Sequence, residues 1–585
     1  MSLQVVLDVA SIALRVLMPI YALVIVYQCF ASARRHRRPE KPLVTLEIME
    51  TGQQIPVLFW ENSIGRSKGS DIRVSDPSVS RDHCVLLRRK EGWFVSDIGS
   101  KHGTFVNGAK TQGRAPVMLD DVITVGSTNF VLKRGDEYQE KLRPSWFFSK
   151  ASNKGSLKPY KLMILITFFH LFMAVEACFS NELQDAVPMM VFGAMELIMW
   201  AFFCISSYAL NRVNFELEAL ACFLSGLGIM MMVRQQGGPH MAMVQTIAMT
   251  AGMIVFAILV KFLENPDRAD RWRLWIMIGS IGLLGVNLIF GVVKNGANNW
   301  LSIGGVSMQP SEFVKIAFIF AGAAALDRLQ TMKNFILFTA FSAACVLALV
   351  IMGDFGTALI FFCTFILTAC MRSGDFRTAA LLVILPIVGA VSAVILVLGL
   401  SKKVDRFAYI ASRFSGWRHV WEHTQDNGGF QQVRVMTYMV SGGLVGVGVG
   451  NGCLKYVGES ESDLVFGMIA EEMGLVVAFI IPAAIIALAF YARAITTRSR
   501  SSFYSISACC AAGLLVIQSM LHIFGITDIL PLTGVTLPFL SAGGSSMISC
   551  WGLLAFIKAA DERTYAAKRR PVAPKNALRE QGVRL

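Results

Sequence analysis

The sequence is poor in charged residues. Only 16% of its 585 residues are Asp, Glu, Lys or Arg, whereas 54% are hydrophobic. Soluble domains carry roughly 25% charged residues, so most of this chain is expected to lie in lipid. Residues 34–158 are the exception, because charges, Gly and Ser return there and no apolar run reaches the about 20 residues that cross a bilayer. The sequence therefore predicts a soluble domain inserted into a membrane protein.

The sequence also lacks any Cys-x-x-Cys spacing. Most of its 12 cysteines stand inside apolar runs, where cysteine packs as a small apolar residue. This pattern argues against both a disulfide framework and a zinc site.

The soluble stretch has no concentrated basic stripe, although the net charge of the chain is +14. Binding to nucleic acid requires such a stripe, so we exclude nucleic acid as a partner. The basic residues instead gather at the ends of apolar runs, as the positive-inside rule describes. They include Arg34, Arg35, Arg37, Arg38, Arg268, Arg271, Arg273, Arg498, Arg500, Lys568, Arg569 and Arg570.

The first apolar run, residues 5–30, is longer than the hydrophobic part of a signal peptide and has no small-residue cleavage site. We interpret residues 1–32 as a retained membrane anchor. The basic cluster at residues 34–38 then places the N-terminus outside the cell and the soluble domain in the cytoplasm.

A linker, residues 134–159, leads to a series of apolar segments. We predict twelve further spans, near residues 160–180, 186–209, 214–234, 241–263, 274–293, 311–326, 335–352, 356–371, 377–400, 464–491, 503–526 and 535–558. This count returns the tail, residues 561–585, to the cytoplasm and leaves two loops outside, residues 294–309 and 401–463. The expected fold class is a mainly α polytopic membrane protein.

Residues 43–133 alternate apolar and polar positions in short runs between turns, which is typical of an all-β sandwich. Four turns carry a set of motifs: Gly65-Arg66, Ser80-Arg81-Asp82-His83, Asp97 with Ser100-Lys101-His102-Gly103-Thr104, and Asn107-Gly108. On these motifs the segment resembles a forkhead-associated (FHA) domain, a family that binds phosphothreonine peptides.

The resemblance implies a role for each motif residue. The implied phosphopeptide-binding residues are Arg66, Ser80 and Arg81 around the phosphate, and Lys101 and His102 at the turn that faces the peptide. A guanidinium fork and a hydroxyl suit a dianionic phosphate. Gly65 and His83 would belong to the scaffold. The family usually has Thr or Ser followed by Asn where this chain has Lys101-His102. This departure affects the strict preference for phosphothreonine and not the binding of phosphate. The alternative is a sandwich that serves only as a docking surface.

Four segments of the membrane part carry information beyond hydrophobicity. They are Asn299 to Lys315 with its Pro-Ser-Glu, Gly353-Asp354-Phe355-Gly356-Thr357, the loop ending in residues 463–474, and Leu530 to Ser546 with its Gly-Gly-Ser-Ser. On these segments residues 214–560 resemble the SEDS (shape, elongation, division and sporulation) family, the FtsW/RodA/SpoVE group of peptidoglycan glycosyltransferases. The family has ten spans, so the resemblance implies a ten-span SEDS-like bundle with about three extra spans, namely the anchor and the spans at 160–180 and 186–209.

In that family an outer loop carries an essential Asp shortly before Gly-Tyr-Gln. Asp426 matches this position when the alignment is anchored on Gln431, whereas an ungapped alignment from Arg413 places His423 there. We assign Asp426 as the catalytic residue. A carboxylate suits the chemistry, because glycan extension needs a general base that takes the proton from the attacking sugar hydroxyl.

The leaving pyrophosphate requires cations, and the same loop holds Arg413 and Lys455. Further residues assigned to substrate binding are Gln431, Trp300, Glu312, Lys315 and Asp463. Their ionisable members could instead pair inside the helix bundle. A divalent cation, Mg²⁺ or Mn²⁺, could share the work on the pyrophosphate, although the sequence offers no dedicated metal cage.

The resemblance implies an enzyme that joins lipid II units into glycan strands, releases undecaprenyl pyrophosphate and works beside a transpeptidase of the class B penicillin-binding type. The FHA-like domain would bind a Ser/Thr-phosphorylated protein. The alternative is a non-catalytic membrane scaffold or a lipid-linked-precursor transporter that the phosphoprotein recruits. Asn298-Asn299 replaces the family's Arg-Arg before Trp300, so the rim of the outer site differs from the family pattern.

Overall fold

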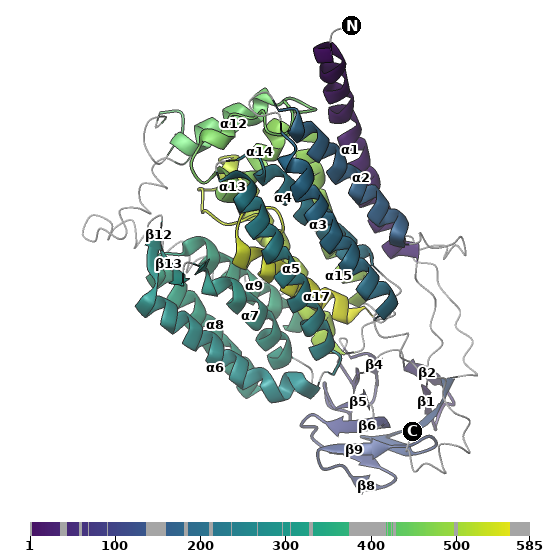
Figure 1. Ribbon diagram of the computed structural model, residues 1–585. Coiled ribbons are helices and arrows are strands. Elements are labelled where there is room, and N and C mark those ends of the chain that lie inside the picture. Colours follow the sequence, from purple (N-terminus) through teal and green to yellow (C-terminus); the bar gives the residue numbers. More distant parts are fainter. Residues whose placement is uncertain are drawn as a thin grey trace.

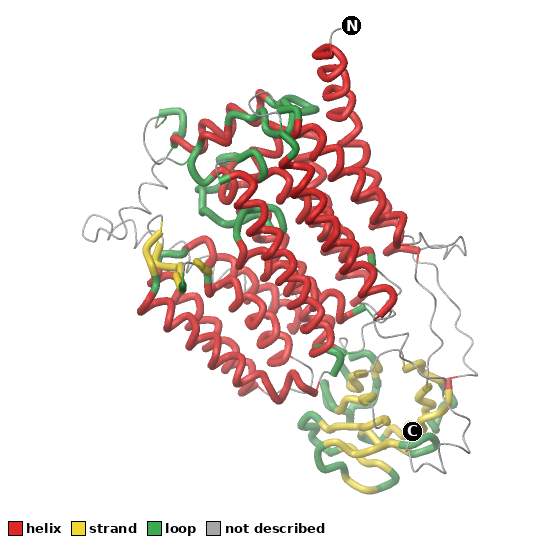
Figure 2. Tube along the Cα trace, in the orientation of Figure 1, coloured by secondary structure: helices red, strands yellow, loops and turns green. Residues whose placement is uncertain are grey.

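The computed structural model describes residues 3–35, 44–57, 61–67, 70–89, 92–135, 159–180, 185–209, 215–235, 237–265, 267–294, 297–304, 306–326, 332–373, 417, 419–422, 424, 429–496 and 501–561. In this part of the chain, a bundle of long helices carries a β-sandwich at one end (Figures 1 and 2). The short helices of residues 429–472 lie at the opposite end. The predicted fold class, a mainly α membrane protein with an inserted all-β domain, is confirmed.

The β-sandwich consists of two sheets. One has the strand order β2-β1-β11-β10-β7-β8 and the other β4-β3-β5-β6-β9. Apolar side chains of both sheets, among them Leu46, Leu86 and Phe130, are fully buried between them. The strands are β1 (Val44–Ile48), β2 (Gln54–Val57), β3 (Glu61–Gly65), β4 (Ile72–Arg73), β5 (Cys84–Arg89), β6 (Gly92–Asp97), β7 (Thr104–Val106), β8 (Ala109–Lys110), β9 (Arg114–Val117), β10 (Val122–Val125) and β11 (Thr128–Arg134).

Three helices precede the main bundle, and we call them the accessory helices. They are α1 (Leu3–Arg35), α2 (Pro159–Cys178) and α3 (Val187–Cys204), the last continued by a π-helical turn (Ile205–Ala209). α1 packs against α2, α4 and α15. In α2, Nδ1 of the buried His170 lies 2.7 Å from Oε1 of Glu196 in α3. Such interhelical polar pairs hold helices together in lipid.

The main bundle comprises α4 (Glu216–Met232), α5 (Gly238–Phe262), α6 (Asp267–Phe290), α7 (Pro310–Leu326), α8 (Met332–Met352), α9 (Phe355–Ser373), α12 (Phe430–Ser441), α13 (Ser460–Asp463), α14 (Val465–Glu472), α15 (Gly474–Thr496), α16 (Ser502–Ile526) and α17 (Gly544–Ala560). Among the described residues, eight helices, the accessory ones included, are long and apolar enough to cross a membrane. α17 packs against α5, α7 and α16. A fully buried ion pair, Lys558 Nζ to Glu218 at 2.8 Å, joins it to α4.

Two predicted spans are wrong in their extent. The span at 464–491 is divided, because Gly474 adopts a left-handed backbone conformation (φ +86°) between α14 and α15. Only glycine adopts this conformation without strain, and a Cβ at Gly474 would overlap the Leu444 carbonyl. The span at 535–558 becomes helical only at Gly544. The predicted span at 377–400 lies outside the described residues.

The predicted outer loop at residues 294–309 contains regular structure. It forms a small antiparallel sheet of β12 (Val292–Lys294), β13 (Ala297–Ile303) and β14 (Val306–Met308). The sheet packs against α6, α7 and α8. Backbone pairing therefore holds the described residues of this loop in a sheet, and β13 lies against the bundle.

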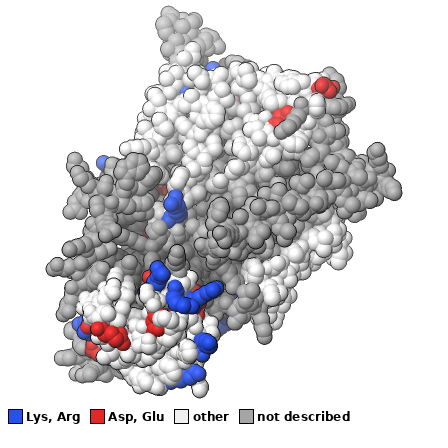
Figure 3. All heavy atoms as spheres, turned by 180° about the vertical axis from the view of Figure 1, so that it is seen from behind, with Lys and Arg blue, Asp and Glu red and all other residues white. Residues whose placement is uncertain are grey.

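Charged side chains are concentrated on the β-sandwich. On the face shown in Figure 3, the flank of the bundle is almost free of charge where it is described, whereas Lys, Arg, Asp and Glu gather on the sandwich. Large apolar side chains are exposed on α6, such as Trp275 (67%) and Ile289 (74%). This distribution indicates a bundle surrounded by lipid and a sandwich surrounded by water.

Candidate functional site

The FHA-like motifs meet at one end of the β-sandwich. The Arg66 amide donates to the Ser80 carbonyl at 3.0 Å, and the Lys101 amide donates to Ser80 Oγ at 3.0 Å. Ser80 therefore lies between the two neighbouring loops. The side chains of Arg66, Arg81, Lys101 and His102 are exposed, so the structure leaves three cations and an imidazole available around one serine.

Two motif residues position these loops from within. His83 is fully buried, its Nδ1 accepts from the Ser80 amide at 3.1 Å, and its Nε2 therefore carries the proton that is donated to the Gly103 carbonyl at 3.1 Å. A Cβ at Gly65 would overlap the Arg81 carbonyl. Both residues act as scaffold, as the sequence indicates.

A carboxylate shapes the peptide-facing turn. The Asp97 side chain accepts from the Ser100 amide at 2.9 Å, from Ser100 Oγ at 2.5 Å and from Thr104 Oγ1 at 2.8 Å. Partial burial by itself raises the pKa of the Asp97 carboxyl, but these hydrogen bonds hold it below its usual range. Asp97 is thus ionised at neutral pH, and its charge holds the turn that presents Lys101 and His102.

In the bundle, Glu312 and Lys315 form a buried ion pair at the start of α7. Lys315 Nζ donates to Glu312 Oε1 at 2.7 Å and to Gln518 Oε1 at 3.0 Å. Gln518, on α16, donates in turn to the Thr536 carbonyl at 2.9 Å. We call these four residues the polar centre. Oε2 of Glu312 has no hydrogen-bond partner among the described residues, so the centre keeps one unused acceptor.

Asp354 joins the three-stranded sheet to α9. Its Oδ2 accepts from Asn299 Nδ2 at 2.8 Å and from Gln309 Nε2 at 3.0 Å, and its Oδ1 accepts from the Thr357 amide at 3.1 Å. Asn299, at one of the positions where the family has Arg, thus holds Asp354. Trp300 follows it on β13.

The irregular segment before α17 is held from two sides. Ser541 Oγ donates to the Ser462 carbonyl at 2.6 Å, and the Ala542 amide donates to the Glu461 carbonyl at 2.8 Å. From α5, Gln245 Nε2 donates to the Ser541 carbonyl at 3.1 Å. The segment therefore connects α13, at the end of the bundle opposite the sandwich, with the helices that surround the polar centre.

Sequence reasoning missed Gln245 and Gln518. Each is an amide in an otherwise apolar span, and that isolation is the signal that could have found it, because a buried amide in lipid needs a partner on another helix. The partners lie hundreds or tens of residues away along the chain, so the sequence does not identify them.

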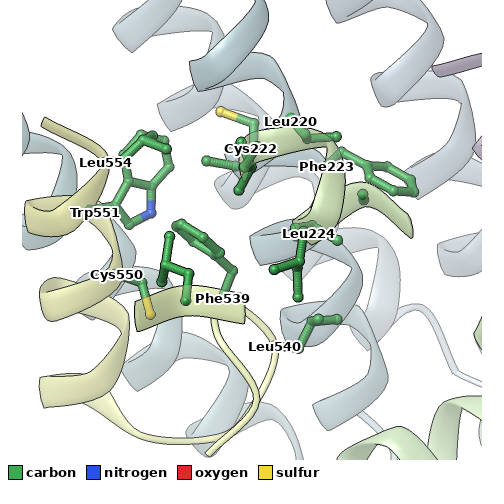
Figure 4. Packing of buried hydrophobic residues seen from close by; sticks show 14 of the residues in the cluster. Leu220, Cys222, Phe223, Leu224, Phe539, Leu540, Cys550, Trp551 and Leu554 are labelled. Carbon is green, nitrogen blue, oxygen red and sulfur yellow. The ribbon is translucent and has the colours of Figure 1, made fainter. Parts of the chain in front are cut away.

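Apolar packing completes the placement of this segment. Phe539 lies between Leu224 of α4 and Trp551 of α17 (Figure 4), with its ring centroid 6.3 Å from that of Trp551. Gly228 of α4 lies directly against the Leu540 backbone, since a Cβ there would come within 2.5 Å of the Leu540 carbonyl oxygen. Glycine at this position lets helix and segment approach closely.

We expect Gly228→Ala to destabilise the protein by about 1–3 kcal/mol, the cost of overpacking against atoms that cannot rotate away. The apparent unfolding temperature of the purified protein in detergent measures this. Gly282→Ala in α6 is the matched control, because no atom lies within 4 Å of a Cβ there. Equal unfolding temperatures of Gly228→Ala and the wild type would contradict the close contact.

At the end of the bundle opposite the sandwich, Lys455 is buried and its Nζ donates to the Gly450 carbonyl at 3.0 Å. Gln431, on α12, donates to the Gly458 carbonyl at 3.1 Å. The carboxylate of Asp463 lies beside Gly534, 3.2 Å from where a Cβ would be.

The remaining predicted residues are not placed. Asp426, its alternative His423 and Arg413 lie outside the described residues, so the structure does not bring them to any site. Within the described ranges, no three His, Cys, Asp or Glu side chains lie close enough together to hold a metal ion.

Sequence comparison decides the family. A profile of the cell cycle protein family FtsW/RodA/SpoVE matches residues 210–566, more than half of the chain. The chain belongs to the FtsW/RodA/SpoVE family. An FHA-domain profile matches residues 62–126, and the chain therefore also contains an FHA domain.

Similar proteins include two curated relatives. The probable peptidoglycan glycosyltransferase FtsW of Bacillus subtilis (strain 168) is 30% identical over 58% of this chain and 86% of its own length. The peptidoglycan glycosyltransferase RodA of Mycobacterium leprae (strain TN) is 27% identical over 62% of this chain and 81% of its own.

Solved structures are also similar. A chain of a peptidoglycan synthase complex that coordinates polymerization and crosslinking is 22% identical, with a TM-score of 0.47, and covers 59% of this chain and 96% of that one. A protein studied for phosphothreonine-dependent FHA domain interactions is 27% identical, with a TM-score of 0.15, and covers 15% and 94%.

The FtsW/RodA/SpoVE match begins at residue 210 and so includes α4 to α17. The accessory helices and the FHA domain lie outside it. The polar centre, Asp354 and the segment before α17 all lie inside it.

Proposed function

We propose that this chain polymerises lipid II into glycan strands and releases undecaprenyl pyrophosphate. The observation that carries the proposal is the buried polar centre in a chain of the FtsW/RodA/SpoVE family. Thr536 of this centre lies on the segment before α17, and Ser541 of the same segment donates to α13. Charged groups buried in a membrane bundle are costly and mark functional sites by default. Relatives named peptidoglycan glycosyltransferases support the same reaction.

In this proposal Asp426 is the general base that accepts the proton of the attacking sugar hydroxyl. Arg413 and Lys455 bind the pyrophosphate of the lipid-linked substrate, a role that a divalent cation would share. The further substrate-binding residues are Gln431, Trp300, Glu312, Lys315 and Asp463. The pairing of Glu312 with Lys315 supports a role for both in setting the shape of the site.

We further propose that the FHA domain binds a Ser/Thr-phosphorylated protein through Arg66, Ser80, Arg81, Lys101 and His102, and that this binding regulates the enzyme. A contact between the two parts supports this. Glu61 Oε2 accepts from the Ser502 amide, at the first turn of α16, at 3.1 Å, while Glu61 Oε1 accepts from Arg89 at 2.9 Å. A carboxylate at a helix N-terminus is favourable. α16 also carries Gln518, so one helix joins the FHA domain to the polar centre.

One experiment tests both activities. The purified protein is incubated with lipid II and Mg²⁺, with EDTA in a parallel reaction, and glycan products are resolved on a gel with and without a phosphothreonine peptide. Polymer is the expected product, and its rate of formation is expected to change with the peptide. If lipid II binds but no polymer forms, the non-catalytic scaffold or transporter is correct instead. The transpeptidase of the class B penicillin-binding type is the expected partner in the cell.

The sidedness of the chain is also a proposal. The FHA domain would face the cytoplasm and the Lys455 end would face outward, because α1 ends and α6 begins at the FHA end of the bundle, and the sequence is basic at both places. The exposed Cys453 marks the outer end, and Ala109 is exposed on β8 of the FHA domain. Burial raises the pKa of the Cys84 thiol to about 12, so the FHA domain's own cysteine is unreactive.

We expect a membrane-impermeant maleimide to label the wild type at Cys453 in intact cells, and Cys453→Ser to remove this label. Ala109→Cys in the Cys453→Ser background should be labelled only after lysis. Labelling of Ala109→Cys in intact cells as strongly as Cys453 in the wild type would reverse the proposed topology.

A further inference from the structure

A glycine-rich loop, residues 442–453, lies between the accessory helices and α14. We call it the glycine loop. Gly446, Gly448 and Gly450 all have positive φ, at 85°, 102° and 83°. Residues with a side chain rarely adopt this conformation, so the glycines allow the path that the loop takes. Contacts with the elements on either side hold the loop in that path.

On one side the loop contacts an ion pair of the accessory helices. Arg15 of α1 and Glu176 of α2 approach to 2.7 Å between Nε and Oε1, and Ser11 Oγ also donates to Glu176, at 3.3 Å. A Cβ at Gly448 would overlap Arg15 Nη2 and come within 2.8 Å of Glu176 Oε1. The ion pair therefore lies directly against the backbone of the loop.

A second cation touches the loop from the end of α4. Arg234 Nε donates to the Ala177 carbonyl at 3.0 Å, and its Nη2 lies 3.0 Å from Oδ1 of Asp185. A Cβ at Gly450 would come within 2.8 Å of Arg234 Cγ. Arg234 thus connects the end of α2 with the glycine loop.

On the other side the loop bonds to the end of α14. The Gly448 amide donates to the Glu472 carbonyl at 2.9 Å, and the Gly450 amide donates to Glu472 Oε2 at 2.8 Å. The Gly450 carbonyl accepts from Lys455 Nζ at 3.0 Å. The loop backbone therefore supplies a hydrogen bond that helps to hold the Lys455 ammonium in place.

We infer that Arg15 and Glu176 are positioning residues for Lys455: the accessory helices hold the glycine loop so that the Lys455 ammonium meets the pyrophosphate of the lipid-linked substrate. This inference rests on the proposed function, in which Lys455 binds that group. Both residues come from helices outside the FtsW/RodA/SpoVE match. The accessory helices are thus part of the substrate site through the loop, and not only additional membrane anchors.

The test replaces the pair by apolar residues of similar size, Arg15→Met with Glu176→Leu, so that no unpaired charge remains in the bundle. We expect the KM for lipid II to rise about tenfold or more, the effect of one displaced hydrogen bond to a charged group, with kcat within about twofold of the wild type. Hydrogen exchange at residues 446–455 should become faster. The charge-reversed pair, Arg15→Glu with Glu176→Arg, should restore the KM and the exchange rate in part. This pair replaces the first variant if the first variant fails to accumulate in the membrane.

The matched control is Glu196→Gln, which weakens the His170–Glu196 pair of the accessory helices without touching the loop. It should leave both the KM and the exchange at wild-type values. An equal rise of the KM in the control would overturn the inference, and so would an unchanged KM with unchanged exchange in the apolar pair. A wild type that makes no polymer would instead refute the proposed function. The inference would then be tested by the Kd for lipid II in place of the KM, together with the hydrogen exchange at residues 446–455.

Discussion

Glycan polymerisation by Asp426→Asn is expected to be about a hundredfold to ten-thousandfold slower than by the wild type, because this is the usual contribution of a general base. Asn cannot accept the proton of the sugar hydroxyl at neutral pH. The sequence around Asp426 is polar, and the amide of Asn is as large as the carboxylate that it replaces, so the exchange should cost little stability. Lipid II consumption by purified protein measures the rate, and the unfolding temperature in detergent checks the fold.

His423→Ala is the paired variant, because the ungapped alignment names His423 as the base instead. It should retain most of the wild-type rate, and Asp426→Glu should retain part of it. Normal polymerisation by Asp426→Asn together with loss in His423→Ala would assign the base to His423. Normal rates in both would remove general-base catalysis by this loop from the proposal.

Arg66→Ala is expected to weaken binding of a phosphothreonine peptide to the FHA domain by about tenfold or more, the contribution of a charge-assisted hydrogen bond. The Arg66 side chain is exposed on a loop, whereas the scaffold contacts of that loop come from backbone groups and the buried His83. The domain should therefore remain folded. Calorimetric titration of the full-length protein measures the affinity.

Arg134→Ala is the matched control. Arg134 is also exposed and is the last residue of β11. The other end of β11 follows Ser127, which donates to Asp76 in the loop that carries Ser80 and Arg81. Arg134 therefore lies away from the phosphate-binding loops. It should bind the peptide as the wild type does, and the rate response of polymerisation to the peptide should disappear only in Arg66→Ala. Wild-type affinity in Arg66→Ala would mean that another group holds the phosphate.

Features with a local cause were predictable from the sequence. The turns of the FHA domain follow from residues a few positions apart, and the structure places Ser80 between the loops of Arg66 and Lys101, as the resemblance to FHA domains implies. The apolar helices follow from their hydropathy alone. The errors arose where hydropathy continues through a break: at Gly474 the chain stays apolar while the backbone turns, and before Gly544 an apolar segment is not helical.

The sequence by itself determined the class of the protein and its division into a membrane part and an FHA domain, and it named the candidate site residues, because apolar run length, turn motifs and family motifs depend on neighbours along the chain. Only the tertiary structure decided which of these residues meet. The buried Gln518 needed a partner, but packing chose Lys315 and Thr536. Likewise, no local pattern foretold that Arg15 and Glu176 lie against Gly448, or that Glu61 binds the first turn of α16. A buried polar group requires a partner wherever it lies, and the folded arrangement of distant helices supplies that partner.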